Sequence, residues 1–105
     1  MSIDLGAIAS NFKCSVDDVK GMLGGIYAEL PNIVDIISVS IESNDCGSVV
    51  MASDMITSQI NHFNLTDIES AISALVASAN ANDQTACVSH FESLKVAINE
   101  IESLL

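Results

Sequence analysis

Apolar residues recur in steps of three and four along most of this chain, which is the spacing of helices that bury one side. In the segment Gly47–Leu65 they form a single stripe, made of Val49, Ala52, Ile56, Ile60 and Phe63. Longer stripes occupy the flanking segments: Val19, Leu23, Ile26, Leu30, Ile33, Ile37 and Ile41 before it, and Ile68, Ile72, Leu75 and Ala79, then Cys87, Phe91, Leu94, Ile98, Ile101 and Leu105, after it. The pattern predicts four long helices.

Turn and cap residues separate these segments. The predicted boundaries are an N-cap at Ser15 with Asp18, a turn over Ser43–Gly47, a helix stop at Asn64, a capping box of Thr66 with Glu69, and a turn over Asn80–Asp83 with Asn82 or Asp83 as the next cap. A short amphipathic helix over Ile3–Asn11 comes first, with Leu5, Ile8 and Phe12 on one side. Long stripes joined by short turns predict an all-α fold, an antiparallel four-helix bundle with the N-terminal helix laid across it, in one domain over residues 1–105.

Two features interrupt the second segment. The ring of Pro31 clashes with the carbonyl four residues earlier, so we expect a kinked helix there, or two helices that are nearly collinear. Gly21, Gly24 and Gly25 each cost a helix about 1 kcal/mol relative to alanine. They either allow a close contact with another helix or mark local weakness.

The outer face of the Gly47–Leu65 segment carries the candidate functional residues. Asp54 lies roughly 200° around the helix from both Ala52 and Ile56, at about 100° per residue, so it should point outward. Apolar and small polar residues accompany it on this face: Val50, Met51, Met55, Thr57, Ser58 and Asn61. A polar centre ringed by exposed apolar side chains indicates a docking surface. The same residues could instead seal a homodimer or pack under the N-terminal helix.

Composition narrows the possible partners. Three Lys and no Arg stand against fourteen Asp and Glu, a formal charge of -11, so nucleic acid and anionic membrane surfaces are not expected to bind. No signal peptide and no run of roughly 20 apolar residues is evident, and the three cysteines are far apart, which favours free thiols and a cytoplasmic protein. No triad, short metal-ligand pair or phosphate-binding glycine loop points to an enzyme, a metal or a cofactor.

The order of elements from about Val16 to Leu105 resembles that of histidine-containing phosphotransfer (HPt) domains of bacterial phosphorelays. The resemblance is carried by AELPNIVDIISVSIESND before the central helix and by the ASANAND turn before the last one. The signature of that family, His-x-x-Lys-Gly, falls here at Asp54, Thr57 and Ser58. A register one residue earlier puts Ser53 at the His position but disrupts the match of the buried stripe.

The resemblance therefore implies a signalling module without the usual chemistry. Asp54 replaces the nitrogen nucleophile, Thr57 brings no positive charge, and Ser58 adds a side chain where the family has none. We expect a domain, monomeric or weakly dimeric, that docks a response-regulator receiver or a histidine kinase without phosphotransfer at the usual site. Alternatives are an active phosphotransfer protein that uses His62 or His90, and a structural or carrier protein. The order Ser53-Asp54-Met55 in mid-helix argues against an acyl carrier, which needs Asp-Ser-Leu at a helix start.

Overall fold

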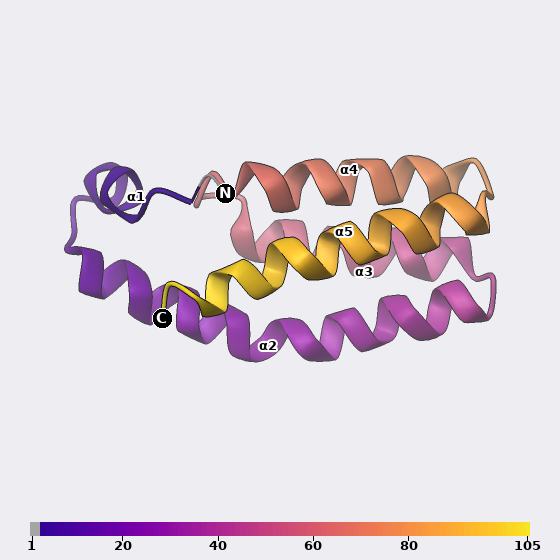
Figure 1. Cartoon of the computed structure of the whole chain (residues 1–105), viewed down its shortest axis with the longest axis horizontal. Coiled ribbons are helices and arrows are strands. Elements are labelled where there is room, and N and C mark those ends of the chain that lie inside the picture. The colour runs from indigo at the N-terminus through magenta and orange to yellow at the C-terminus, as the bar shows by residue number, and fades with distance from the viewer. Residues whose placement is uncertain (1–2) are drawn as a thin grey trace.

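The computed structural model describes residues 3–105, and every regular element in that range is a helix (Figure 1). The helices are α1 (Leu5–Phe12), α2 (Val16–Glu42), α3 (Cys46–Ile60), α4 (Thr66–Asn80) and α5 (Gln84–Glu102). The all-α class predicted from the sequence is confirmed. Helices α2 to α5 lie side by side along the long axis of the molecule, which measures 42 × 20 × 20 Å.

Helix α2 begins at the predicted cap and runs through its proline. The backbone N–H of Asp18 donates to Ser15 Oγ at 3.1 Å, and the backbone N–H of Ser15 donates back to Asp18 Oδ2 at 3.3 Å. The helix is continuous from Val16 to Glu42 with Pro31 inside it, and Figure 1 shows it bending midway. The first of the two expected outcomes, one kinked helix, is therefore the observed one.

The three glycines of α2 lie against open space. A Cβ atom built on Gly21, Gly24 or Gly25 would meet nothing within 4 Å beyond the helix's own backbone. A close helix contact at these positions is therefore ruled out within the described chain. Because none has a positive φ, their effect is a local loss of helix stability.

Two of the later helices are capped by aspartates. The carboxylate of Asp45 accepts from the backbone N–H of Ser48, and the carboxylate of Asp83 accepts from that of Ala86, both at 3.1 Å. The capping box predicted for α4 is wrong: Thr66 is already the first helical residue, and the N-cap position belongs to Leu65, whose side chain makes no capping hydrogen bond.

The central helix is shorter than the sequence pattern indicated. It ends at Ile60, and residues 61–64 form turns in which the backbone N–H of Phe63 donates to the carbonyl of Ile60 at 2.9 Å. Asn64 adopts the expected left-handed conformation, with φ 54°, but it does so in the last position of these turns and not at the helix end. Phe63 stays buried, so the apolar stripe continues beyond the helix.

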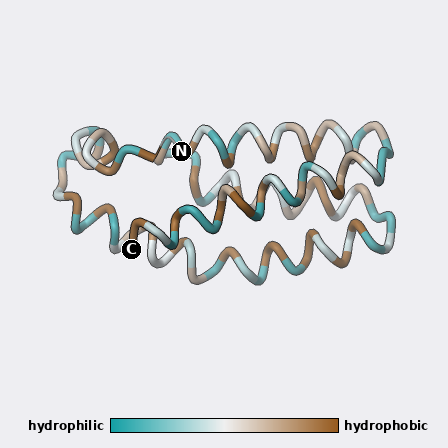
Figure 2. The backbone as a smooth tube through the Cα atoms, in the orientation of Figure 1, coloured by the Kyte–Doolittle hydropathy of each residue, from teal (hydrophilic) through white to brown (hydrophobic). Residues whose placement is uncertain are grey.

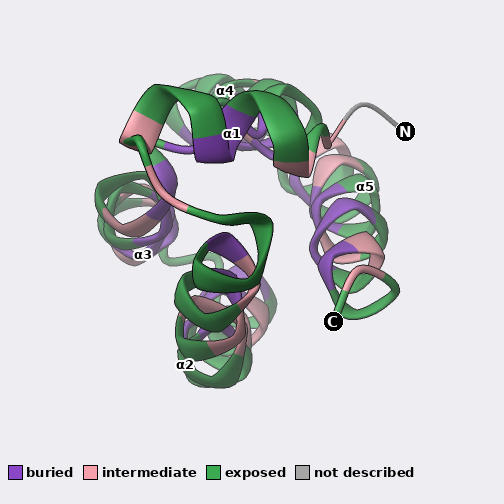
Figure 3. Cartoon of the chain, turned by 90° about the vertical axis from the view of Figure 1, so that its left-hand side faces the viewer, coloured by how far each residue is buried: buried purple, intermediate pink, exposed green. Residues whose placement is uncertain are grey.

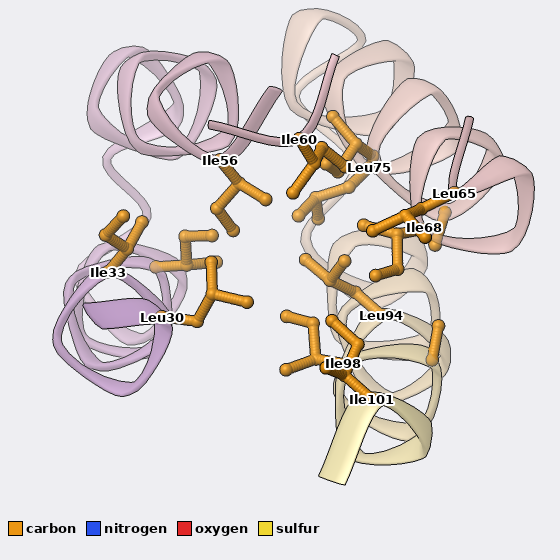
Figure 4. Close-up of a cluster of buried hydrophobic side chains, with 14 of the residues drawn as sticks. Leu30, Ile33, Ile56, Ile60, Leu65, Ile68, Leu75, Leu94, Ile98 and Ile101 are labelled. Carbon is orange, nitrogen blue, oxygen red and sulfur yellow. The ribbon is translucent and has the colours of Figure 1, made fainter. Parts of the chain in front are cut away.

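The core lies between the four long helices. α2 contacts α3, α3 contacts α4, α4 contacts α5, and α5 contacts α2, which closes the ring around the apolar stripes. Figure 4 shows side chains from all four helices pointing into the same space, among them Leu30, Ile56, Leu75 and Leu94. Apolar and polar positions alternate along each helix in Figure 2, as the stripes predict. Leu105, the last predicted stripe residue, lies beyond α5 and is exposed.

Helix α1 covers one end of the molecule. Figure 3 shows it lying across that end, and it contacts α2. Ile8 and Ala9 are buried, and the ring of Phe12 meets that of Phe63 edge-on at 5.2 Å between centroids. Because α1 begins at Leu5 and ends at Phe12, it is shifted relative to the predicted Ile3–Asn11 span.

Helix α2 is the one helix of the described chain that is long and apolar enough to cross a membrane by length and composition. Its most apolar stretch has a mean hydropathy of 1.3, and 22% of that stretch is buried. The sequence-based expectation that no such stretch exists is therefore corrected. The core helix of a soluble protein meets the same two criteria, so a single helix of this kind is weak evidence for a membrane span.

Candidate docking surface

Asp54 lies on the exposed side of α3, as predicted, and its carboxylate has no hydrogen-bond or ion-pair partner among residues 3–105. The hydroxyls of Thr57 and Ser58 donate to backbone carbonyls of α3 and not to the Asp54 carboxylate. Ser58 Oγ donates to the backbone carbonyl of Asp54 at 3.1 Å, and Thr57 Oγ1 donates to that of Ser53 at 3.2 Å. Ser53 itself is fully buried, so a partner could meet the helix at Asp54 but not in the register one residue earlier.

Val50 does not belong to the outward face. It is half-buried and packs against the core, whereas the sequence pattern placed it beside Met51 and Met55. At about 100° per residue, Val50 turns toward the same flank of α3 as the buried Ser53. Another helix covers that flank, which the periodicity of α3 alone could not indicate.

Met51 and Met55 are exposed by 70% and 47%, so neither packs under α1. Both lie on the opposite flank of α3 from Val50. Asn61, the remaining predicted surface residue, caps the C-terminal end of α3 and is exposed. Of the three apolar side chains expected around Asp54, the structure leaves these two methionines available to a partner.

Two residues of α2 extend this apolar surface. Ile36 is 46% exposed and Val39 is 61% exposed. Pro31 and Val34 line the seam between α2 and α5, so that flank of α2 faces α5. Ile36 lies about 100° around the helix from the buried Ile37, on the opposite flank, and therefore lies toward α3. We call the surface formed by Ile36, Val39, Met51 and Met55 the α2–α3 face. The sequence-based prediction did not include Ile36 and Val39, although both are apolar residues outside the α2 stripe, which is the signal that could have indicated them.

No cation lies on α3, because the three lysines are Lys13, Lys20 and Lys95. Lys95, on α5, forms an ion pair with Glu92 at 2.8 Å, and its ammonium lies 4.8 Å from the centre of the Phe91 ring. Asp54 therefore has no neighbour on its own helix that could balance the charge of a phosphoryl group. The HPt signature has a lysine at the position of Thr57, and α3 supplies no other positive charge in its place.

The two histidines lie apart from Asp54 and from each other. His62 is exposed in the turns after α3, whereas the longer predicted helix would have included it. His90 is half-buried on α5 and lines a groove between α4 and α5. His90 lies on α5, whereas Met51 and Met55 lie on α3.

The cysteines and acidic residues do not form a metal site. Within residues 3–105 no group of three or more His, Cys, Asp or Glu side chains is arranged to hold a metal ion. Cys14, Cys46 and Cys87 are free thiols. Burial, chiefly, together with the nearby Cys46 and Asp83, raises the pKa of the Cys87 thiol, so it stays protonated at neutral pH.

Comparison of the chain with protein-family models, with curated proteins and with solved structures found no match. The surface just described and the resemblance of the sequence are therefore the two features that bear on function.

Proposed function

We propose that this protein is an HPt-like signalling module, in which α2 to α5 form an antiparallel four-helix bundle and α1 lies across one end. The ring of contacts between the four long helices and the short turns that join them support this arrangement. The exposed position of Asp54 agrees with that of the phosphorylated histidine in the family. The partner is a response-regulator receiver or a histidine kinase domain, met in the cytoplasm.

The observation that carries the proposal is the α2–α3 face. Four exposed apolar side chains lie on α2 and α3, and two of them, Met51 and Met55, are on the helix that carries Asp54. Methionine side chains adapt to different partner surfaces because they are unbranched and polarizable. Aliphatic side chains of this kind contribute to binding when a partner removes them from water.

The proposed mechanism is occupancy of the partner's docking face without acceptance of a phosphoryl group. A carboxylate at position 54 offers no nitrogen nucleophile, and α3 supplies no cation to stabilise the transferred charge. Docking would bring Asp54 toward the acidic pocket of a receiver. A divalent cation in that pocket would attract the carboxylate, and its removal would leave two like charges facing each other.

A binding experiment tests the docking face. Met55→Lys should weaken binding to a cognate receiver or kinase domain at least tenfold, because it places an unpaired charge in a desolvated contact. Val88→Lys on α5 is the matched control, since Val88 is 48% exposed and the charge change is identical. Binding should be measured by titration calorimetry against the receiver and kinase domains of the source organism. Equal affinities of the two variants, or no binding by the unaltered protein to any of these domains, would contradict the proposal.

A phosphorylation experiment tests the absence of transfer. Incubation with a phosphorylated receiver should leave the unaltered protein unlabelled. Asp54→His combined with Thr57→Lys and Ser58→Gly should restore weak transfer, because the site is exposed and these changes rebuild the signature. Labelling of the unaltered protein that disappears in Asp54→Asn would contradict the proposal. Labelling that is lost only in His62→Ala or His90→Ala would favour the alternative of an active phosphotransfer protein.

A further inference from the structure

Helix α1 is attached to the molecule differently from the other four helices. The long helices form a closed ring of contacts around the core, from α2 through α3, α4 and α5 back to α2. Among the described helices, only α2 brings its backbone close to that of α1, which lies across one end of the bundle (Figure 3). The ring is therefore complete without α1.

The contacts that hold α1 in place are apolar. Its buried and half-buried apolar side chains are Leu5, Ile8, Ala9 and Phe12. The ring of Phe12 meets that of Phe63, in the turns after α3. Within residues 3–105, every hydrogen bond of α1 stays inside the segment 4–14, and no ion pair joins this helix to the bundle. Because apolar contacts are non-directional, α1 can leave the bundle without breaking a polar link to it.

The packing of α1 against the bundle is incomplete on one side. A crevice of about 180 Å³ lies between α1 and the turns after α3, lined by Ala7, Ile8 and Asn11 on one wall and by Phe63 and Asn64 on the other. This space is large enough for several water molecules, each of which takes about 30 Å³ in the liquid. The interface therefore lacks part of the close packing that makes a protein interior resistant to opening.

The length of α1 and the residue that follows it also favour opening. α1 has eight residues, whereas helices shorter than about 12 residues are marginal in water unless they are packed against another element. Lys13, directly after α1, has the left-handed conformation with φ 56°, in which its Cβ crowds the backbone. Detachment therefore relieves a strained residue and returns conformational freedom to the whole segment.

We propose that α1 is a detachable lid on the end of the bundle, which opens and closes as one unit while α2 to α5 stay folded. Opening uncovers Phe63, which is only 7% exposed when the lid is closed, together with the part of α2 that α1 covers. The lid thus controls whether this apolar end of the bundle faces water. The α2–α3 face contains no residue of α1, so the inference does not rest on the HPt-like function.

Native-state hydrogen exchange of the full chain, followed by NMR at low urea concentrations, tests the lid. The amides of Ile8 and Lys13 are hydrogen-bonded near the two ends of α1. Both should be protected to the same extent, at least about 100-fold less than the amide of Leu94 in the core. Their exchange should also respond less to urea, because opening of the lid exposes little surface.

Two outcomes of this measurement would overturn the proposal. Protection and urea dependence equal to those of Leu94 would show that α1 unfolds only together with the bundle. Protection that rises steadily from Ile8 to Lys13 would show that α1 frays from its N-terminal end and does not open as a unit.

A matched pair of substitutions separates the lid from the bundle. Ile8 on α1 and Ile98 on α5 are buried alike, at 4% and 5% exposure, and replacement by valine is mild enough to keep the fold. Ile8→Val should speed exchange at Lys13 about twofold to tenfold. Ile98→Val should speed exchange at Leu94 by a similar factor and leave Lys13 unchanged, because opening of the lid does not involve α5. Equal acceleration of Lys13 and Leu94 in Ile98→Val, or no acceleration of Lys13 in Ile8→Val, would contradict an independent lid.

Discussion

The outward position of Asp54 depends on the phase of α3, and two adjacent residues on that helix test this phase. Ile56 is fully buried at 0% exposure, whereas Met55 is 47% exposed. Replacement by alanine removes side-chain carbon at both positions, but only Ile56 loses contacts within the core. The two substitutions therefore differ in cost only if the helix is oriented as described.

The magnitude for Ile56→Ala follows from its burial. The substitution removes three buried carbon groups at about 0.8 kcal/mol each, and incomplete collapse of the cavity raises the total to about 3–4 kcal/mol. Such a loss should lower the melting temperature by about 12–25 °C in a domain of this size. Met55→Ala should cost less than about 1 kcal/mol, because much of its side chain is already in water and alanine is the better helix former.

Guanidinium unfolding, followed by far-UV circular dichroism, gives the free energy of unfolding of both variants. The slope of the unfolding free energy against guanidinium concentration should stay the same, because the surface exposed on unfolding hardly changes. A Met55→Ala variant that loses as much stability as Ile56→Ala would show that Met55 is buried. The phase of α3 would then be wrong, and with it the exposure of Asp54 and the α2–α3 face.

Three further predictions concern other parts of the chain. Gly25→Ala should raise the free energy of unfolding by about 0.5–1 kcal/mol, since its Cβ meets open space; a loss of stability in the same unfolding assay would reveal a contact on that face of α2. Hydrogen bonds from the hydroxyl and backbone N–H of Ser48 lower the pKa of Asp45 below its usual 3.8. The ionised Asp45 carboxylate therefore stabilises the fold above pH 3.8, and this stabilisation is lost as the pH falls through the lower pKa of the folded state. Asp45→Asn should therefore flatten the acid-side decline of the urea midpoint between about pH 6 and about pH 2, and an unchanged decline would contradict this role. Iodoacetamide should modify Cys87 more slowly than Cys46, because burial raises the pKa of the Cys87 thiol and shields it; mass spectrometry of the alkylated protein measures both rates.

The sequence by itself determined the features that depend on neighbours along the chain. The period of the apolar stripe places Ile56 inward and Asp54 outward, because a helix turns by about 100° per residue whatever surrounds it. The capping box of Ser15 with Asp18 and the left-handed conformation of Asn64 are also local, and both are present. The local signal fails at α4: Thr66 has the side chain of an N-cap residue, yet the N-cap position belongs to Leu65 and Thr66 is already the first helical residue.

Only the tertiary structure decided which exposed positions are covered by another helix. Val50 and Met55 look alike in the periodicity of α3, but a neighbouring helix covers the flank that carries Val50 and leaves Met55 in water. The α2–α3 face combines residues from two helices, so the pattern of either helix alone could not indicate it. The physical reason is that helical period fixes directions around one axis, whereas burial depends on how the axes pack against one another.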